Sequence, residues 1–399
     1  MADSKRAASR TAARIAAVES YIVRLPRDVP YLGPLGPGEE VNAKGYIVRR
    51  KNRTIYPTAD MSVIVKVVAT DGTVGWGETY GIVAPKAVTA IIDDVLGPVM
   101  LGRDPCDATA IRHDLYDLMR VRNQSGGYYG DALAGVDIAM WDLFGKLAGL
   151  PLCKLLGGQR TDRIPAYVSG LPRATLDERV ALAKEWVGNG FDAIKYAAAI
   201  SHEGIVAEMR ALREALGPGV RLMVDLHWQF SASEAIQLID ELTPYRPYFA
   251  EAPCAPEDIE GLALVAARSR IPIAAGEEWR SVHEALPRLE RRALAFVQPE
   301  MGHTGVSEFI AIGNLASAFH VKVIPHAAIG VGIFQAASLH AAAALPNVPY
   351  HEYQHSIFDR NLQYVQTTMR CEAGHYQLPE GPGIGVEPAP ALWNFVVAG

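Results

Sequence analysis

Ionisable residues recur at nearly constant intervals through the second half of the chain, each at the end of a short apolar run. The runs are DAIKYA, RLMVDLH, PYFAEAP, IPIAAGEE, LAFVQPE, VKVIPHA and VPYHEY, and the ionisable residues are Lys195, Asp225, Glu251, Glu277, Glu300, His326 and Glu352. Successive residue numbers differ by 30, 26, 26, 23, 26 and 26. Polar groups at the carboxyl ends of successive parallel strands meet at one mouth of a (β/α) barrel, where that fold carries its active sites. The spacing therefore predicts an enzyme.

Three acidic residues, Asp225, Glu251 and Glu277, follow three consecutive predicted strands. Because neighbouring strands lie roughly 4.8 Å apart, these carboxylates are expected to converge and to repel one another. A bound cation removes that repulsion, and an all-oxygen ligand set favours Mg²⁺ or Mn²⁺ over zinc. The alternatives are acids at the starts of surface loops, or an exchange of roles between Glu277 and the adjacent Glu278.

Two histidines in the series are candidates for proton transfer. Glu300 and His326 follow the next two predicted strands, and a carboxylate beside an imidazole raises the basicity of the ring. This pair is predicted to be the general base, the alternative being a buried structural histidine. His227 lies two residues beyond Asp225, so in an extended chain both side chains point to the same side. His227 is predicted to be the general acid.

The first and last residues of the series complete the predicted site. Lys195 is expected to place positive charge beside the substrate, the alternative being a buried amine paired with one of the carboxylates. Glu352 is expected to hydrogen-bond a substrate oxygen while protonated.

The elements that position these residues are predicted to be an α/β fold, a (β/α)7β TIM-like barrel with an α+β capping domain. The first barrel strand is IPAYVSG (164–170). Capping-box patterns, which open helices, then follow three strands, at Thr175 to Glu178, Ser231 to Glu234 and Ser281 to Glu284. Upstream, alternating apolar and polar residues predict antiparallel strands, and helical patterns come next. These strands span 13–25 and 60–80, with a turn at Asp71-Gly72, and the helical patterns span 84–98, 106–122 and 128–149.

The predicted domains are a disordered tail at 1–12, the capping domain at 13–140, the barrel at 141–355, and a segment at 356–399 that returns to the capping domain. Residues 26–59 are rich in proline, glycine and charge. A loop of that length is often a functional lid.

Composition excludes several classes of protein. A net charge of −6 over 399 residues provides no basic surface for nucleic acid. The cysteines at 106, 153, 254 and 371 are scattered, which favours reduced thiols and a cytoplasmic location. Residues 1–14 lack the apolar core of a secretion signal. Residues 323–351 contain no Asp, Glu, Lys or Arg, but their prolines and glycines argue against a membrane helix.

These residues, in this order, resemble the enolase superfamily, specifically its mandelate racemase-like acid sugar dehydratases. The resemblance covers almost the whole chain, including DGTVGWGE (71–78) and ALAGVDIAMWDLFGKLAGLPLCKLLGG (132–158). It implies Mg²⁺ bound by Asp225, Glu251 and Glu277, and a homo-oligomer that acts on a small sugar acid.

Two departures from the family pattern bear on the reaction. The family often carries Lys-x-Lys on the second barrel strand, its second lysine being a base, whereas this chain has Lys195-Tyr196-Ala197. The usual His–Asp pair appears as His326 with Glu300. The first departure disfavours racemisation, which needs a base on each face of the substrate. The Asp-x-His pattern ending at His227 is similar to that of galactonate and gluconate dehydratases.

The resemblance thus implies dehydration of an aldonate or aldarate to a 2-keto-3-deoxy acid. His326 would remove the proton α to the metal-bound carboxylate, and His227 would protonate the departing β-hydroxyl. Arg49, with its basic neighbours, is expected to hold a distal carboxylate, although a solvated basic loop is the alternative. Tyr56 and Trp228 are expected to contact substrate hydroxyls or ring atoms.

Rival readings are an epimerase or lactone cycloisomerase of the same family, a Schiff-base lyase that uses Lys195, and a sugar-acid binder without activity. The metal carboxylates argue against the lyase, and the complete pair of His326 and Glu300 argues against the binder.

Overall fold

Eight parallel strands form a barrel in the computed structural model, which describes residues 13–30, 33–36, 38–50, 53–327 and 330–397. The strands are β6 (Arg163–Ser169), β7 (Ala193–Ala197), β8 (Arg221–Asp225), β9 (Phe249–Glu251), β10 (Ile273–Ala275), β11 (Phe296–Val297), β12 (Lys322–Val323) and β13 (His351–Tyr353). They pair in chain order from β6 to β12, and β13 pairs with β6. Between β12 and β13, the Glu352 amide donates to the Pro325 carbonyl at 3.2 Å. The predicted (β/α)7β barrel is confirmed.

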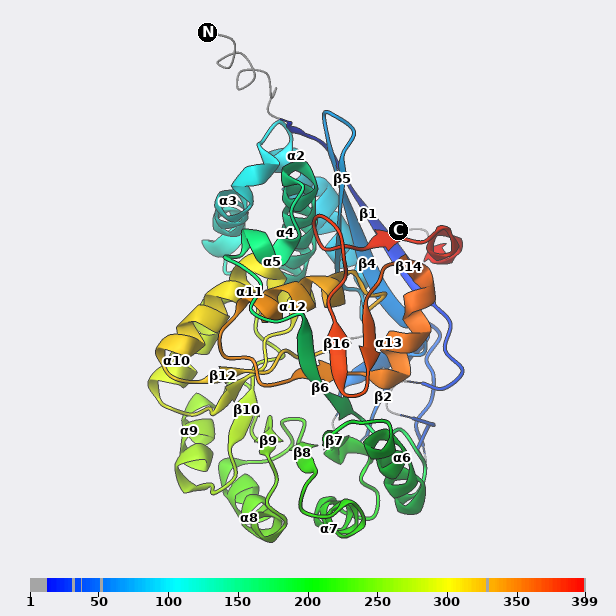
Figure 1. Ribbon diagram of the computed structural model, residues 1–399, viewed down its shortest axis with the longest axis vertical. Coiled ribbons are helices and arrows are strands. Elements are labelled where there is room, and N and C mark those ends of the chain that lie inside the picture. Colours follow the sequence, from blue (N-terminus) through cyan, green and yellow to red (C-terminus); the bar gives the residue numbers. More distant parts are fainter. Residues whose placement is uncertain (1–12, 31–32, 37, 51–52, 328–329, 398–399) are drawn as a thin grey trace.

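Each strand from β6 to β12 is followed by a helix, and these helices cover the outside of the barrel (Figure 1). They are α6 (Leu176–Gly188), α7 (Ile205–Leu216), α8 (Ala232–Leu242), α9 (Ile259–Arg268), α10 (Val282–Glu290), α11 (Met301–Ala318) and α12 (Ile333–Ala344). The predicted capping boxes of α6, α8 and α10 are all present. Each satisfies amide groups that the first turn of a helix leaves without an intrahelical partner.

A two-residue period inside the barrel decides where the polar side chains point. The buried cluster in the barrel interior takes one residue from each strand or its immediate continuation: Tyr167, Ala193, Met223, Phe249, Ala274, Phe296, Ile324 and Tyr350. Alternate residues of a strand share a face. The residues two positions after five of these are Lys195, Asp225, Glu251, His326 and Glu352. They consequently point into the barrel, one layer above an apolar floor.

The capping domain is an antiparallel sheet covered by helices, in the upper part of Figure 1. Its sheet has the order β18 (Val396–Val397), β1 (Ile15–Leu25), β4 (Asp60–Ala69) and β5 (Val74–Tyr80). Its helical segments are α1 (Pro85–Ile91), the π-helical turn Ile92–Leu96, α2 (Gly97–Met100), the 3₁₀ turn Pro105–Asp107, α3 (Ala108–Arg120) and α4 (Gly127–Ala148), which leads to α5 (Leu152–Leu155). Within the predicted lid, β2 (Tyr46–Val48) and β3 (Ile55–Pro57) form a hairpin.

The C-terminal segment contacts both domains. It contains α13 (His355–Asn361), the 3₁₀ turns Leu362–Tyr364 and Pro390–Phe395, and the strands β14 (Val365–Gln366), β15 (Arg370–Glu372), β16 (His375–Gln377) and β17 (Glu387–Pro388), followed by β18. β18 pairs with β1 of the capping domain, whereas β16 pairs antiparallel with β6 of the barrel. The division predicted between residues 140 and 141 falls inside α4. The domain ranges stay predictions, and the predicted disordered tail at 1–12 lies outside the described residues.

A buried carboxylate joins the two domains close to the barrel mouth. Glu78, on β5, is fully buried and accepts hydrogen bonds from the amides of Val331, Ile333 and Phe334 at 2.6, 2.9 and 3.2 Å. These amides belong to the start of α12, where a helix favours an anion. The Ser62 hydroxyl also donates to Glu78, at 2.6 Å. These hydrogen bonds connect the capping sheet to the segment that follows His326.

Because His340 is buried in α12, we expect the folded protein to lose stability in acid. Burial lowers the pKa of His340 from 6.5 to about 4. Below pH 6.5 the unfolded chain therefore binds a proton that the folded chain refuses until about pH 4, so stability falls as the pH falls through this window. The total is on the order of 3 kcal/mol. Urea unfolding of His340→Leu should show a correspondingly smaller decrease than the wild type.

The control for this measurement is His113→Leu, at an exposed position of α3, which should leave the decrease unchanged. If His340→Leu and the wild type lose the same stability between pH 6.5 and 4, the neutral buried histidine is not the cause.

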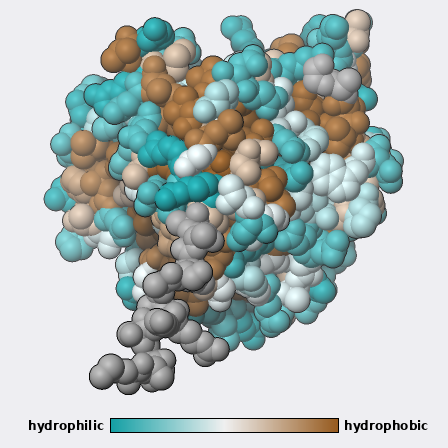
Figure 2. Space-filling model, turned by 90° about the horizontal axis from the view of Figure 1, so that it is seen from above, coloured by the Kyte–Doolittle hydropathy of each residue, from teal (hydrophilic) through white to brown (hydrophobic). Residues whose placement is uncertain are grey.

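The surface of the capping end is mixed in polarity. Seen from above, apolar residues gather near the centre of this face among hydrophilic ones (Figure 2). Exposed apolar side chains of the capping domain include Val99, Leu101, Leu118 and Val121. The homo-oligomer expected from the family resemblance stays a prediction. Within the described residues, no helix combines the length and apolar character needed to cross a membrane.

Candidate active site

A cavity of about 240 Å³ lies at the carboxyl ends of the barrel strands, between the barrel and the capping domain. Its lining includes six of the predicted site residues from the barrel, Lys195, Asp225, His227, Glu277, His326 and Glu352. Tyr56 and Trp228 also line it, together with Tyr80 from β5. Glu251 and Glu300 are almost completely buried, and they do not line the cavity but contact residues that do.

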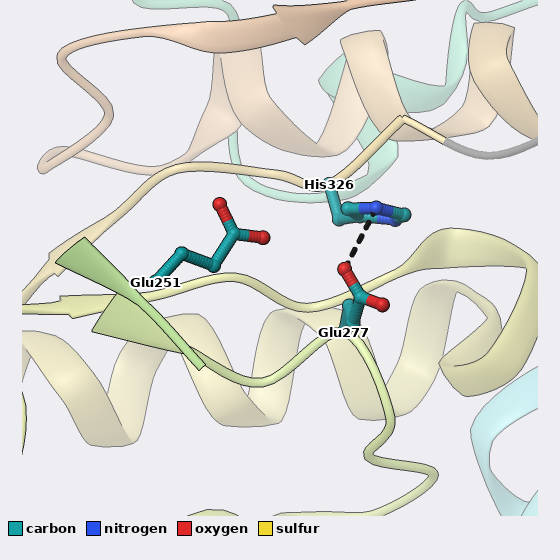
Figure 3. Close-up of side chains that lie close together, drawn as sticks. All are labelled: Glu251, Glu277 and His326. Carbon is teal, nitrogen blue, oxygen red and sulfur yellow. Dashed lines mark ion pairs between the residues drawn. The ribbon is translucent and has the colours of Figure 1, made fainter. Parts of the chain in front are cut away.

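Within the described residues, Glu251, Glu277 and His326 form a group of three ligand-type side chains that could hold a metal ion. One ligand atom of each lies within 4.8 Å of the other two. In Figure 3 the Glu277 carboxylate faces the ring of His326, and its Oε2 is 2.9 Å from Nε2 of that ring. Gly276, with φ +134, turns the chain out of β10 so that Glu277 reaches this position; a Cβ at Gly276 would lie 3.0 Å from the Gln298 amide nitrogen. Glu277, not Glu278, is the member of the group.

Asp225 lies beside this group but outside it, which differs from the predicted set of three converging carboxylates. It is the register partner of Glu251 on the adjacent strand. Its Oδ2 is 2.7 Å from Nδ1 of His227, and its Oδ1 accepts from the His227 amide at 2.9 Å. The physical reason is local charge pairing, because a buried carboxylate is stabilised by the nearest cation.

The turn after β8 places His227 by a route other than the predicted extended chain. His227 and Trp228 both have positive φ, 52° and 53°, a conformation that costs free energy for residues other than glycine and is concentrated at functional sites. The Trp228 amide donates to the Ala252 carbonyl at 2.6 Å, which helps to hold the turn. Burial lowers the pKa of His227, but Asp225 and the neighbouring glutamates raise it to about 9.

Lys195 and Glu352 form a buried ion pair that also includes Glu251. The Lys195 Nζ lies 2.7 Å from Glu251 Oε2 and 2.9 Å from Glu352 Oε1. Burial raises the pKa of Glu352, but Lys195 and His326 outweigh it and hold that pKa at about 2. The prediction of a protonated Glu352 is wrong, because Lys195 stabilises its ionised form. Lys195 is a buried amine paired with carboxylates, as the alternative prediction for it stated.

Glu300 and His326 form the predicted pair. Glu300 Oε2 lies 2.8 Å from His326 Nδ1, and the backbones of the two residues form an isolated parallel bridge. Burial lowers the pKa of His326, but Glu277, Glu352 and Glu300 together raise it well above its usual value. A cation held by Glu277 would offset the largest of these charges and lower the pKa, so that the ring could accept a proton. Because Glu300 engages Nδ1, Nε2 is the ring nitrogen that faces the cavity group.

The donor set fits a hard divalent cation. Glu251 Oε1 is buried and has no hydrogen-bond partner, a costly arrangement for a carboxylate oxygen. Glu251, Glu277 and Asp225 offer oxygen ligands, which Mg²⁺ prefers, whereas zinc would also recruit His326. With Mg²⁺ the imidazole remains available for proton transfer.

The predicted substrate-binding residues separate into two groups. Tyr56 and Trp228 line the cavity. Arg49 does not: its guanidinium pairs with Glu39 at 2.7 Å and donates to the carbonyls of Gly33 and Pro34. Its expected role in holding a distal carboxylate is corrected, because the guanidinium of Arg49 is already engaged by Gly33, Pro34 and Glu39. Among the basic neighbours of Arg49, Lys51 lies outside the described residues.

Sequence reasoning missed two basic residues that line the cavity, Arg280 and His303. Each is three residues beyond a member of the predicted series, Glu277 and Glu300. In this fold the segments that follow barrel strands carry binding groups. The position of Arg280 and His303 just after two such strands could therefore have identified them. Their common partner, Asp131, comes from the capping domain, and nothing in the local sequence points to it.

The fold and the site together define an enzyme of the enolase superfamily. Residues 178–392 match the family model described as enolase C-terminal domain-like. Residues 53–157 match the N-terminal domain of mandelate racemase and muconate lactonizing enzyme. The chain belongs to this superfamily and is mandelate racemase-like.

Individual relatives carry two kinds of activity. The chain is 33% identical to the D-galactonate dehydratase of Cronobacter sakazakii over 358 residues, 84% of this chain and 90% of the relative. It is 32% identical to the D-galactarolactone cycloisomerase of Agrobacterium fabrum over 338 residues, 82% of this chain and 88% of the relative. A solved structure from Sinorhizobium meliloti, provisionally assigned as an isomerase, has a TM-score of 0.95 at 56% identity, covering 96% of this chain and 99% of that one.

Proposed function

We propose that this enzyme is a Mg²⁺-dependent dehydratase that converts a sugar acid to a 2-keto-3-deoxy acid. The observation that carries the proposal is that two histidines, His326 paired with Glu300 and His227 paired with Asp225, lie on the same cavity. Elimination of water needs these two tasks, a base at the α-carbon and an acid at the β-hydroxyl.

His326 is the base in this proposal. Its Nδ1 is held by Glu300, so Nε2 is directed at the substrate and receives the α-proton. Ala197 stands where many relatives carry a second lysine base, so abstraction is expected from one face. This arrangement supports elimination over racemisation.

His227 is the acid. Asp225 contacts its Nδ1, which leaves Nε2 to deliver a proton to the departing hydroxyl. Lys195, fixed between Glu251 and Glu352, supplies a positive charge that stabilises negative charge developing on the substrate carboxylate.

The energy balance explains why a cation is part of the proposal. An α-proton that is ~10 pKa units less acidic than imidazolium opposes transfer by ~14 kcal/mol, whereas one oxyanion donor offsets roughly 2.7–4 kcal/mol. Bound by Glu251, Glu277 and Asp225, Mg²⁺ supplies Lewis-acid stabilisation of the substrate carboxylate.

A substrate screen tests the proposal. The enzyme with Mg²⁺ is incubated with a panel of aldonic and aldaric acids, and 2-keto-3-deoxy products are detected as semicarbazones, with EDTA as the control. We expect a metal-dependent keto product from at least one acid. Absence of a keto product from every acid on the panel would contradict the proposal.

A lactone cycloisomerase or an epimerase is the second candidate, favoured by the cycloisomerase among the relatives. It would use the same base and release no water. Deuterium uptake at the α-carbon, with an isomeric acid in place of a keto product, would establish it.

A further inference from the structure

The cavity has a second charged region, formed by Arg280 and His303, which the proposed reaction does not use. Arg280 follows β10, and His303 lies in the first turn of α11. Both line the same cavity as the Glu277 carboxylate and His326. Their side chains are 19% and 12% exposed, so the charge of Arg280 is largely removed from water yet reaches the cavity.

Asp131 holds both side chains from the capping domain. Its Oδ1 lies 3.1 Å from Arg280 Nε and 2.6 Å from His303 Nδ1. Burial raises the pKa of Asp131, but His303 and Arg280 outweigh it and keep that pKa below its usual value. One carboxylate is thus shared by a permanent cation and by an imidazole.

Other contacts fix the direction of the two groups. Arg280 Nη1 donates to the Glu278 carbonyl at 2.5 Å, so the planar guanidinium has one orientation. The ring of His303 stacks on Tyr80 with centroids 3.8 Å apart and an interplanar angle of 21°. Since Asp131 engages Nδ1 of His303, Nε2 is the ring nitrogen left for another partner. A rigid guanidinium beside an imidazole suits a carboxylate, which accepts two hydrogen bonds.

We propose that Arg280 and His303, positioned by Asp131, bind the distal carboxylate of a dicarboxylic substrate. The substrate is then an aldaric acid, or a lactone derived from one, in preference to an aldonic acid with a neutral terminus. This inference rests on the proposed function, in which the first carboxylate of the substrate would bind the cation held by Glu251, Glu277 and Asp225. It also moves the distal-carboxylate role from Arg49, whose charge is used within the loop, to residues that line the cavity.

The test compares matched acids on wild type, Arg280→Met and His303→Gln. For each sugar configuration, kcat and KM are measured with the aldarate and with the corresponding aldonate in saturating Mg²⁺. We expect the wild type to prefer the aldarate. Arg280→Met should raise KM for the aldarate roughly 10- to 100-fold, the usual range for a lost charge-assisted hydrogen bond, with kcat nearly unchanged. Turnover of any aldonate should change by less than about threefold.

Arg291→Met is the matched control, because Arg291 is exposed and pairs with Glu260 outside the cavity. It should leave both substrates unaffected. His303→Gln keeps a hydrogen-bond donor in place of the imidazole and is expected to give an intermediate increase in KM. It also provides a second reading if Arg280→Met fails to fold in thermal melts.

Failure of this inference is distinguishable from failure of the proposed function. If aldonates are processed as well as aldarates and Arg280→Met affects both equally, Arg280 is structural and the inference is overturned, while dehydration stands. If no acid reacts, the proposed function fails, and calorimetric titration decides the inference separately. Aldarate binding in Mg²⁺ that is weakened by Arg280→Met, without a change for the aldonate, supports it; equal or absent binding overturns it.

Discussion

Replacing His326 with asparagine is expected to lower kcat by roughly 10²–10⁴-fold, the usual contribution of a positioned general base. Asparagine retains polarity close to the Nδ1 position, so contact with Glu300 can persist, but it cannot take up a proton. His326 contacts Glu277 and Glu300 at 2.9 and 2.8 Å. The two glutamates follow different strands, β10 and β11.

The measurement is kcat with the acid identified by the screen, together with deuterium uptake at its α-carbon. Both should fall in parallel in His326→Asn, because they share one proton abstraction. Glu300→Gln is the companion variant, and as a positioning residue it should cause a smaller decrease and shift the pH–rate profile. Exchange that persists at the wild-type rate in His326→Asn would assign the base elsewhere.

A fold control accompanies this variant, because removing His326 leaves the Glu277 carboxylate without a cationic partner. Thermal unfolding in Mg²⁺ should stay cooperative. A loss of turnover accompanied by loss of the unfolding transition would reflect stability, and Glu300→Gln, which keeps the histidine, would then decide the assignment.

Removing divalent cations is expected to abolish turnover and to lower stability together. Burial, and repulsion by Asp225 and Glu277, raise the pKa of Glu251 to about 8, against the opposing effect of Lys195. A cation bound to these carboxylates relieves the repulsion. Since a ligand that binds only the folded state stabilises it by RT ln(1 + [L]/Kd), Mg²⁺ at one hundred times its Kd should add about 2.7 kcal/mol.

The measurement is a titration of EDTA-treated enzyme with Mg²⁺, recording turnover and melting temperature. Both should rise with the same apparent Kd, and Mn²⁺ should replace Mg²⁺. Glu251→Gln should weaken both responses, while Asp258→Asn, at the start of α9 and outside the cavity, is the control. Full turnover in EDTA would eliminate the metal site. Reactivation by Zn²⁺ alone would place His326 among the ligands and remove it from the role of base.

Much of the site was predictable because the spacing in the sequence follows strand geometry. Residues two positions apart on a strand share a face, so Lys195, Asp225 and Glu251 point inward above Ala193, Met223 and Phe249. The repeat of about 26 residues places one such residue at each successive strand end. The meeting of Glu300 with His326 follows from this repeat alone, because the two strand ends are neighbours in the barrel.

The sequence by itself thus determined the barrel, the polar layer at its mouth and the pairing of His326 with Glu300. Only the tertiary structure decided how the charges pair. His227 pairs with Asp225, and Lys195 pairs with the ionised form of Glu352. Arg49 pairs with Glu39 within its own loop. The tertiary structure also brought Asp131 to Arg280 and His303, across 149 and 172 residues of sequence. The reason is physical. Strand periodicity is local and leaves a regular pattern in the sequence, whereas a buried charge pairs with whichever opposite charge the packing of two domains places nearest, and no local pattern records that partner.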